Sequence, residues 1–293
     1  MNLPRAKTRD AVRAAAEVAA AKVPPVLLQA ERLAETVLLG AHGRRRSGIG
    51  DTFWQYRNAG PLDDARRIDW RRSARGDQTF VQEREWQVAR NVVLWVDQAH
   101  SMRFGSAGVE KAERAAVLGL AVAIILLRGG ERAGIVGPRN VPPMRGASQI
   151  ARLTAAILES PECDYGVPPS VAFDSAGVIM ISDFLGDIEA IESSVGSLAA
   201  RGRRGILFQI VDPHEREFPF EGRTIFESMG GTIWHETDRA AGLREGYRAR
   251  FAKREAALRD LARSRGWIFG QHVTDRAATE GLVWLRNAVE GQA

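Results

Sequence analysis

Several oxygen-bearing side chains stand where apolar runs of the sequence end. Asp97 and Ser101 follow one such run, Asp183 follows a second and Asp212 a third. Ligands of open α/β sheets bind beyond the carboxyl ends of the strands, so we expect these oxygens to gather at one edge. Carboxylates and a hydroxyl suit a hard ion such as Mg²⁺. Carboxylates at such positions also cap helices and accept loop N–H groups, and spacing alone leaves both roles open.

The elements that would position these side chains follow from hydrophobic periodicity. Continuous apolar runs predict strands covered on both faces, and apolar residues at helical spacing predict the helices between them. The expected strands are 92–96, 132–136, 178–181, 206–211 and 267–269, and the expected helices are 109–128, 150–158, 188–198, 243–261 and 276–290. This alternation predicts an α/β fold with a doubly wound, mostly parallel sheet and helices on both faces.

Two segments precede the regular pattern. Residues 1–42 are expected to form a helical N-terminal extension in two pieces, and the second piece has an amphipathic stripe that must pack on something. Residues 43–90 contain glycines and turn residues between short segments, with an alternating strand at 79–86. We expect a small β or irregular subdomain there, followed by the α/β domain at 91–293.

Composition indicates an ordinary folded protein. The 293 residues are 45% hydrophobic and 26% charged, which argues against wholesale disorder. Cys163 is the only cysteine, so an intramolecular disulfide and a multi-cysteine zinc site are excluded and a reducing compartment is the simplest inference. The first residues are polar, and the longest apolar run is shorter than the ~20 residues that cross a bilayer. We therefore expect a cytoplasmic protein without a transmembrane segment.

Arginines concentrate in residues 44–75, although the net charge of the whole chain is only +5. A small excess on a long chain is a weak signal for nucleic acid, because binders place their excess on one face or arm. We favour a solvated or partner-facing patch and expect no nucleic-acid partner.

The Arg-rich segment also contains acidic residues and a tryptophan around the sequence Ile-Asp-Trp. These candidate signature residues are Asp63, Asp64, Arg67, Asp69, Trp70 and Arg75. Charge-assisted pairs between Asp69 and neighbouring arginines would lock the segment to the main domain, with Trp70 as a packing anchor. The alternative is that the acids and arginines form a partner-docking face. We favour the structural role.

Two stretches resemble the von Willebrand factor A domain. They are Val-Asp-Gln-Ala-His-Ser-Met at 96–102 and Ile-Ser-Asp-Phe at 181–184. Upstream, Tyr-Arg-Asn-Ala-Gly at 56–60 and the Ile-Asp-Trp stretch at 67–75 resemble the signature of one bacterial branch. That branch is domain-of-unknown-function family 58, often encoded beside MoxR-type AAA+ ATPases. The resemblance extends from about Gly43 to Glu290 and implies a von Willebrand factor A-like fold.

The resemblance also implies a site. Von Willebrand factor A domains hold a divalent cation in a metal-ion-dependent adhesion site. By this likeness Asp97 matches the first aspartate of the motif, Ser101 the second serine and Asp183 the aspartate of the third loop. Ala99 stands where the first serine belongs, and Ser148 is the candidate for the threonine of the second loop. A degenerate site that binds Mg²⁺ weakly is the expectation.

The function expected from this pattern is a non-catalytic protein-binding module. Its implied partners are a MoxR-type ATPase or other von Willebrand factor A proteins, in complex assembly or chaperone-like work. The sequence contains neither a Gly-x-Ser-x-Gly elbow nor a phosphate-binding Gly-x-x-x-x-Gly-Lys-Ser/Thr loop. The alternatives are a metal-dependent hydrolase that uses the same carboxylates with His100 nearby, and nucleic-acid binding through residues 44–75.

Overall fold

The computed structural model describes nine stretches of the chain and divides it into two units. The described residues are 24–41, 53–60, 68–74, 78–84, 89–159, 161–170, 173–175, 177–227 and 234–291. One unit is residues 44–89 and the other is the remainder of the chain.

The larger unit is built on a six-stranded sheet. Its strands are β3 (Asn91–Val96), β4 (Arg132–Ile135), β5 (Val141–Met144), β6 (Gly177–Ser182), β7 (Arg204–Val211) and β10 (Ile268–Val273). Their order across the sheet is β10-β7-β6-β3-β4-β5. All neighbouring strands are parallel except β4 and β5. The expected mostly parallel α/β sheet is confirmed.

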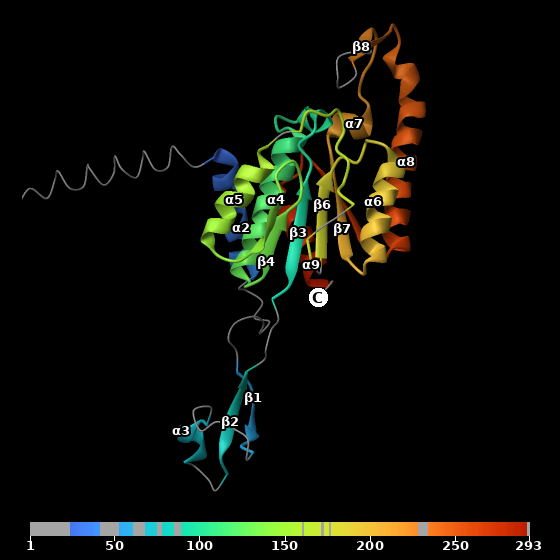
Figure 1. Ribbon diagram of the computed structural model, residues 1–293. Helices are drawn as coiled ribbons and strands as arrows, with labels where there is room; N and C mark the ends of the chain where they lie inside the picture. The colour runs from blue at the N-terminus through green and yellow to red at the C-terminus, as the bar shows by residue number, and fades with distance from the viewer. Residues whose placement is uncertain are drawn as a thin grey trace, which may run out of the picture. The chain divides into compact units, whose positions relative to one another are not determined.

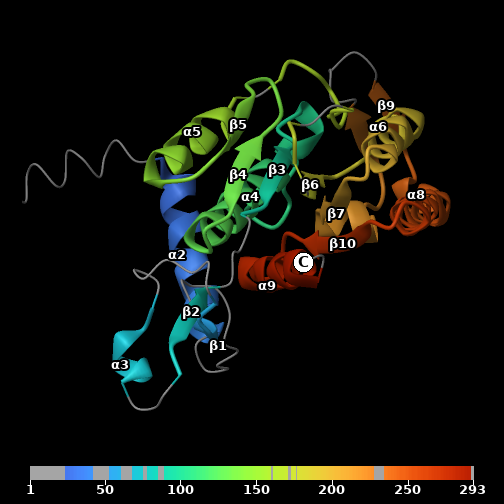
Figure 2. The ribbon, with the colours of Figure 1, turned by 60° about the horizontal axis from the view of Figure 1, so that its bottom comes forward.

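Helices cover both faces of this sheet (Figures 1 and 2). On one side lie α2 (Pro25–Ala41), α4 (Lys111–Arg128), α5 (Ala147–Ile157) and α9 (Ala278–Gly291), and on the other lie α6 (Ile188–Ala200) and α8 (Arg244–Ser264). Each strand serves both layers because successive side chains point to opposite faces. Leu94 belongs to the first core cluster and its neighbour Trp95 to the second.

The N-terminal helix packs as its apolar stripe requires. Ala30, Ala34 and Val37 recur at helical spacing and are buried in the same cluster as the apolar residues of α4 and α9. This helix therefore forms part of the larger unit, whereas the first expected helical piece lies outside the described residues. Among the described residues, no helix combines the length and the apolar character needed to span a bilayer.

Two features of this unit depart from the expected pattern. The strand β5 runs antiparallel at the edge of the sheet and contains Pro142 and Pro143, which an edge strand tolerates. Between β7 and α8 the chain forms α7 (Pro213–Glu217), a hairpin of β8 (Thr224–Glu227) and β9 (Trp234–Thr237), and η3 (Ala240–Leu243). Strands of four residues are too short to show a reliable period in sequence.

The smaller unit contains a two-stranded sheet. It pairs β1 (Phe53–Asn58) with β2 (Phe80–Arg84) in antiparallel fashion, and α3 (Trp70–Ser73) lies between them in sequence. Ser73 connects the Ile-Asp-Trp segment to β2 by hydrogen bonds. Its hydroxyl donates to the carbonyl of Asp69 and accepts from the N–H of Phe80. This contact gives the segment a structural role inside its own unit.

Candidate functional site

Asp97 and Asp183 meet at the switch point of the sheet. Asp97 follows β3 and Asp183 follows β6, which is the parallel neighbour of β3. The N–H of Asp97 donates to the carbonyl of Ile181 at 2.9 Å. The helix after β3 covers one face of the sheet and the helix after β6 covers the other, which is the arrangement that opens a crevice at the strand ends. The prediction that these two aspartates share one edge is confirmed.

Each oxygen of the Asp97 carboxylate accepts a hydrogen bond from within the protein. Its Oδ1 accepts from the N–H of Ala99 at 2.9 Å, and its Oδ2 accepts from the hydroxyl of Ser182 at 2.7 Å. The backbone of Gly166 covers it, since a Cβ at that position would lie 2.2 Å from Oδ2. Burial raises the pKa of Asp97 to about 6, and the bonds from Ser182 and Ala99 oppose that rise.

Asp183 is bound to a buried lysine that the sequence reading did not single out. Its Oδ1 accepts from the N–H of Leu185 at 3.0 Å, and its Oδ2 accepts from Nζ of Lys111 at 2.9 Å. The same Nζ lies 2.6 Å from Oε1 of Glu215, and the side chain of Lys111 has no exposed surface. Burial lowers the pKa of Lys111, but the two carboxylates outweigh it and leave the pKa above its ordinary value.

Asp212, the third carboxylate, caps a helix. It is fully buried at the end of β7, and it accepts from the N–H and hydroxyl of Ser106 and from the N–H of His214. Glu215 accepts from the N–H of Asp212 at 3.2 Å, which completes a capping box at the start of α7. Asp212 therefore has the capping role, and Glu215 joins α7 to Lys111.

The two candidate hydroxyls fall in different places. Ser101 is buried near Asp97, and its hydroxyl has no hydrogen-bond partner among the described residues. Ser148 lies at the start of α5, which follows the antiparallel strand β5. The end of β5 pairs with Ala133, and Ala133 pairs with Val92 at the beginning of β3. Ser148 is therefore at the opposite edge from Asp97, and assigning it the place of the threonine was wrong.

The residues at this edge do not fit the cation expected from the resemblance. Mg²⁺ requires near-octahedral oxygen ligands at about 2.1 Å. Both oxygens of Asp97 and both of Asp183 accept bonds from protein donors, and one of those donors is the ammonium of Lys111. Ala99 has no oxygen in its side chain. In the part of the chain that the structure describes, no three His, Cys, Asp or Glu residues are grouped as metal ligands.

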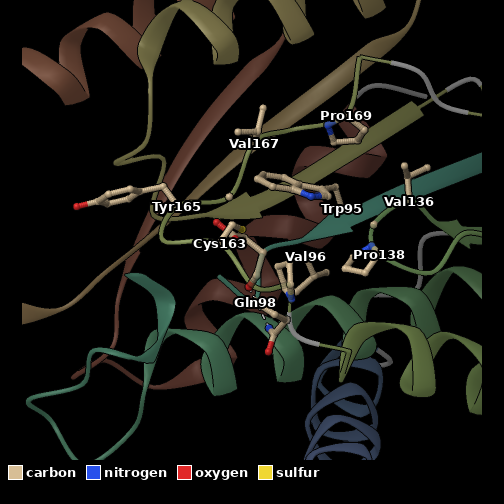
Figure 3. A pocket seen from close by; sticks show the side chains of 13 residues that line it. Trp95, Val96, Gln98, Val136, Pro138, Cys163, Tyr165, Val167 and Pro169 are labelled. Atoms are coloured by element: carbon tan, nitrogen blue, oxygen red, sulfur yellow. Dashed lines mark hydrogen bonds between the residues drawn. The ribbon is translucent and has the colours of Figure 1, made fainter. Parts of the chain in front are cut away.

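A pocket of about 410 Å³ opens beside Asp97. Its walls come from the end of β3, the turn after β4 and the loop at 161–169, and they are mostly apolar. Figure 3 shows Trp95 between Val167 and Pro169 on one side and Pro138 on another, with the ring of Tyr165 directed away. Tyr165 is 42% exposed and Val167 is 59% exposed. The pocket is large enough for a small ligand or for a side chain of a partner.

Two groups that look reactive in sequence are held in structural surroundings. Cys163 lines the pocket, and burial raises the pKa of its thiol, with Asp97 and Asp164 adding to the effect. His272 is buried, and its Nε2 lies 3.3 Å from a guanidinium nitrogen of Arg114. Burial, and after it the charge of Arg114, lower the pKa of His272 to about 4. The imidazole is therefore neutral at physiological pH.

Most of the upstream signature residues lie outside the described residues, namely Asp63, Asp64, Arg67, Arg75 and the arginines at 44–46. Their proposed pairing, and any nucleic-acid contact by them, stay predictions. Asp69 is described through its contacts with Ser73 and Phe80. Trp70 is 63% exposed in its own unit. Its expected role as an anchor on the main domain stays a prediction.

Comparison with known proteins identifies the family of this chain. The fold is a doubly wound α/β sheet with a buried charge centre at its switch point. The chain belongs to the family described as Protein of unknown function DUF58, whose model matches residues 55–257. The family expected from the upstream signature is thus confirmed.

The relatives in this comparison are themselves uncharacterized. The chain is 28% identical over 263 residues to the uncharacterized proteins Rv1480 of Mycobacterium tuberculosis (strain ATCC 25618 / H37Rv) and Mb1516 of Mycobacterium bovis (strain ATCC BAA-935 / AF2122/97), and each alignment covers 84% of this chain and 80% of the relative.

Among solved structures, the conserved hypothetical protein BatB from Bacteroides thetaiotaomicron has a TM-score of 0.40 at 12% identity, covering 70% of this chain and 98% of that one. An aerotolerance-related membrane protein from Bacteroides fragilis has a TM-score of 0.39 at 12% identity, covering 69% and 100%. These likenesses are too weak to bear on function.

Sequence reasoning missed Lys111, Glu215 and Gly166. One signal was available for Lys111. It is one of four lysines in an arginine-rich chain, and it is the first residue of a helix, where a cation opposes the helix dipole. A lysine at this unfavourable position indicates that a carboxylate nearby compensates its charge. For Glu215 the sequence offered the capping-box spacing Asp212-x-x-Glu215, which indicates a helix start but not the contact with Lys111. It contained no comparable signal for Gly166, which contacts a residue distant in the chain.

Proposed function

We propose that the chain is a non-catalytic protein-binding module that docks a partner at the carboxyl edge of its sheet. The observation that carries this proposal is the apolar pocket beside Asp97, with Tyr165 and Val167 exposed at its margin. Ligands of such sheets bind at the switch point, and exposed apolar groups around a concave site are typical of protein-docking surfaces.

The bonding of the carboxylates favours binding over hydrolysis. A metal-dependent hydrolase needs carboxylate oxygens free to hold an ion and its activated water. Here Asp97 accepts from Ala99 and Ser182, and Asp183 accepts from Leu185 and Lys111. These hydrogen-bonded carboxylates stabilise the floor of the pocket.

The margin of the pocket favours a basic partner segment. In the stretch 161–167 the side chains that line the pocket alternate with the exposed acids Glu162 and Asp164. The complementary ligand is a segment of a partner protein with an apolar side chain for the pocket and an arginine or lysine beside it.

The candidate partner is a MoxR-type AAA+ ATPase, with another von Willebrand factor A protein as the second choice. Its support is the resemblance of residues 56–60 and 67–75 to the branch encoded beside such ATPases. The proposed role is assembly or chaperone-like work, in which the module presents the pocket to the ATPase or to its client.

The test is direct binding of the purified ATPase from the same genome to the intact chain, measured by interferometry with and without ATP. Val167→Asp at the pocket should weaken binding about tenfold or more, since burying an unpaired charge costs well over 1 kcal/mol. The matched control is Val283→Asp on α9, where a valine is 39% exposed away from the pocket.

Charge reversal tests the chemistry of the partner segment. Glu162→Lys should weaken binding and reduce its salt dependence, whereas Glu192→Lys on the exposed face of α6 should leave both unchanged. Equal affinities for wild type, Val167→Asp and Glu162→Lys would remove the pocket as the docking surface. Absence of any binding with ATP present would remove this ATPase as the partner.

A further inference from the structure

We propose that the ammonium of Lys111 takes the place of a divalent cation at this edge, so that the chain carries its own cation and needs no metal there. This inference is independent of the identity of any partner. It assigns a role to a buried lysine that lies between two carboxylates from different elements.

The geometry places one cation where several carboxylates converge. Nζ of Lys111 lies 2.9 Å from Asp183 and 2.6 Å from Glu215. Lys111 begins α4, Asp183 follows β6 and Glu215 lies on α7, so a single charged group connects three elements. A metal ion bound at about 2.1 Å to Oδ2 of Asp183, on the side of the oxygen that faces Nζ, would overlap Nζ.

Because the site is buried, Asp183 and Glu215 need the positive charge of Lys111 as their counter-charge. The side chain of Lys111 has no exposed surface, Asp183 is 2% exposed and the side chain of Glu215 is 15% exposed. Buried carboxylates are tolerated only when they are paired or coordinate a metal. Removing the ammonium leaves two carboxylates facing the space that the lysine side chain filled.

The alternative is an ordinary ion pair beside a separate metal site on Asp97. The surroundings of Asp97 argue against it. Ser182 and Ala99 donate to its two oxygens, and Gly166 leaves no room for another atom at van der Waals distance on its side. The two oxygens bound to Lys111 are the ones that an incoming cation would find free once the lysine is gone.

The experiment compares metal binding by the intact wild-type chain and its variants. Thermal shift and calorimetric titration with Mg²⁺, Mn²⁺ and Ca²⁺ are carried out on wild type, Asp183→Asn, Lys111→Ala, Lys111→Ala with Asp183→Asn, and Lys253→Ala. Lys253 is an exposed lysine on α8 and serves as the matched control. Wild type and Lys253→Ala should show no saturable shift at millimolar metal.

Lys111→Ala should melt at a lower temperature and gain a saturable, metal-dependent rise, because two carboxylates and water refill the vacated space. The rise should disappear when Asp183→Asn is added. A saturable shift in wild type that Asp183→Asn abolishes would overturn the proposal. So would a Lys111→Ala chain that folds but gains nothing from any of the three ions.

A second variant keeps the test open if Lys111→Ala does not fold. Lys111→Met keeps a long unbranched side chain, one heavy atom shorter than lysine, and removes its charge. It should melt well below Lys111→Arg, which retains a cation, and it should not respond to metal because its methyl end fills the position. A melting temperature for Lys111→Met equal to that of wild type would contradict the role of the ammonium.

Discussion

Gly166 lies so close to the carboxylate of Asp97 that any Cβ there would stand 2.2 Å from Oδ2 and 2.3 Å from Oδ1. The loop at 161–169 thus closes over Asp97 by its backbone alone. The contact explains how a buried aspartate can form the floor of an open pocket: glycine supplies the cover, and the neighbouring side chains supply the walls.

The first prediction concerns this contact. Gly166→Ala should destabilise the protein by about 1–3 kcal/mol or more, because the inserted methyl must displace a carboxylate held by two hydrogen bonds. Gly137 lines the same pocket, and a Cβ there would meet nothing within 4 Å. Gly137→Ala is the matched control and should change the free energy of unfolding by less than about 0.5 kcal/mol. Urea unfolding measures both, and equal effects would show that the loop adjusts freely.

The second prediction uses the raised pKa of Asp97. Its pKa is about 6 in the folded chain against 3.8 in the unfolded one, so the folded state binds the proton more tightly. The linked stability is present at low pH and is lost as pH rises from about 4 to 6, by about 3 kcal/mol in total. Asp97→Asn should remove this loss and should be more stable than wild type at pH 7 if the amide keeps the bonds to Ala99 and Ser182.

Urea unfolding at several pH values between 4 and 7 measures this difference. Asp164→Asn is the control, since Asp164 is about half exposed on the adjacent loop and should leave the slope as it is in wild type. Parallel pH profiles for wild type and Asp97→Asn would mean that Asp97 titrates as it does in the unfolded chain.

The third prediction concerns His272, for which stability changes with pH in the opposite direction. Its pKa is lowered from 6.5 to about 4, so the unfolded state binds the proton more tightly. Stability is full above pH 6.5 and is lost as pH falls toward 4, by about 3 kcal/mol. His272→Gln should remove this loss of stability at acid pH. The glutamine side chain still offers an oxygen acceptor to Arg114. The exposed His214 supplies the control, because His214→Gln should leave the acid limb unchanged.

Asp97 and His272 oppose each other over nearly the same pH range. Wild-type stability should therefore vary less between pH 4 and 6 than that of either single variant, and the double variant should return to the flat profile. A double variant with the slope of one parent would show that only one of the two groups is perturbed.

The fourth prediction separates two buried serines. The hydroxyl of Ser182 donates to Asp97 and accepts from the N–H of Phe184 at 3.0 Å, whereas that of Ser101 has no partner within the described chain. Ser182→Ala leaves two buried groups unsatisfied and should cost about 1–3 kcal/mol. Ser101→Ala should be neutral or slightly stabilising. Calorimetric melting measures both variants, and a large loss for Ser101→Ala would indicate that its hydroxyl has a ligand.

Much of the fold could be read from local pattern. The continuous apolar runs at 92–96, 178–181 and 206–211 predicted β3, β6 and β7, because a strand covered on both faces has no polar side to show. The rule for strand ends then placed Asp97 and Asp183 together, and the structure agrees. These inferences succeed because they depend on the period of a segment and on the polarity of a parallel sheet.

Other decisions required the tertiary structure. The antiparallel return of β5 carried Ser148 to the far edge, and its proline-containing four-residue stretch gave no usable period. The partnership of Lys111 with Asp183 and Glu215 joins residues more than 70 positions apart. No local spacing encodes such a contact.

By itself, the sequence determined that this protein is a mostly parallel α/β domain with aspartates gathered at one edge. Only the tertiary structure decided what those aspartates bind. Hydrophobic period is a local property, so it survives in the linear chain. The contact between Lys111 and Asp183 joins distant parts of the chain, so only tertiary packing determines it.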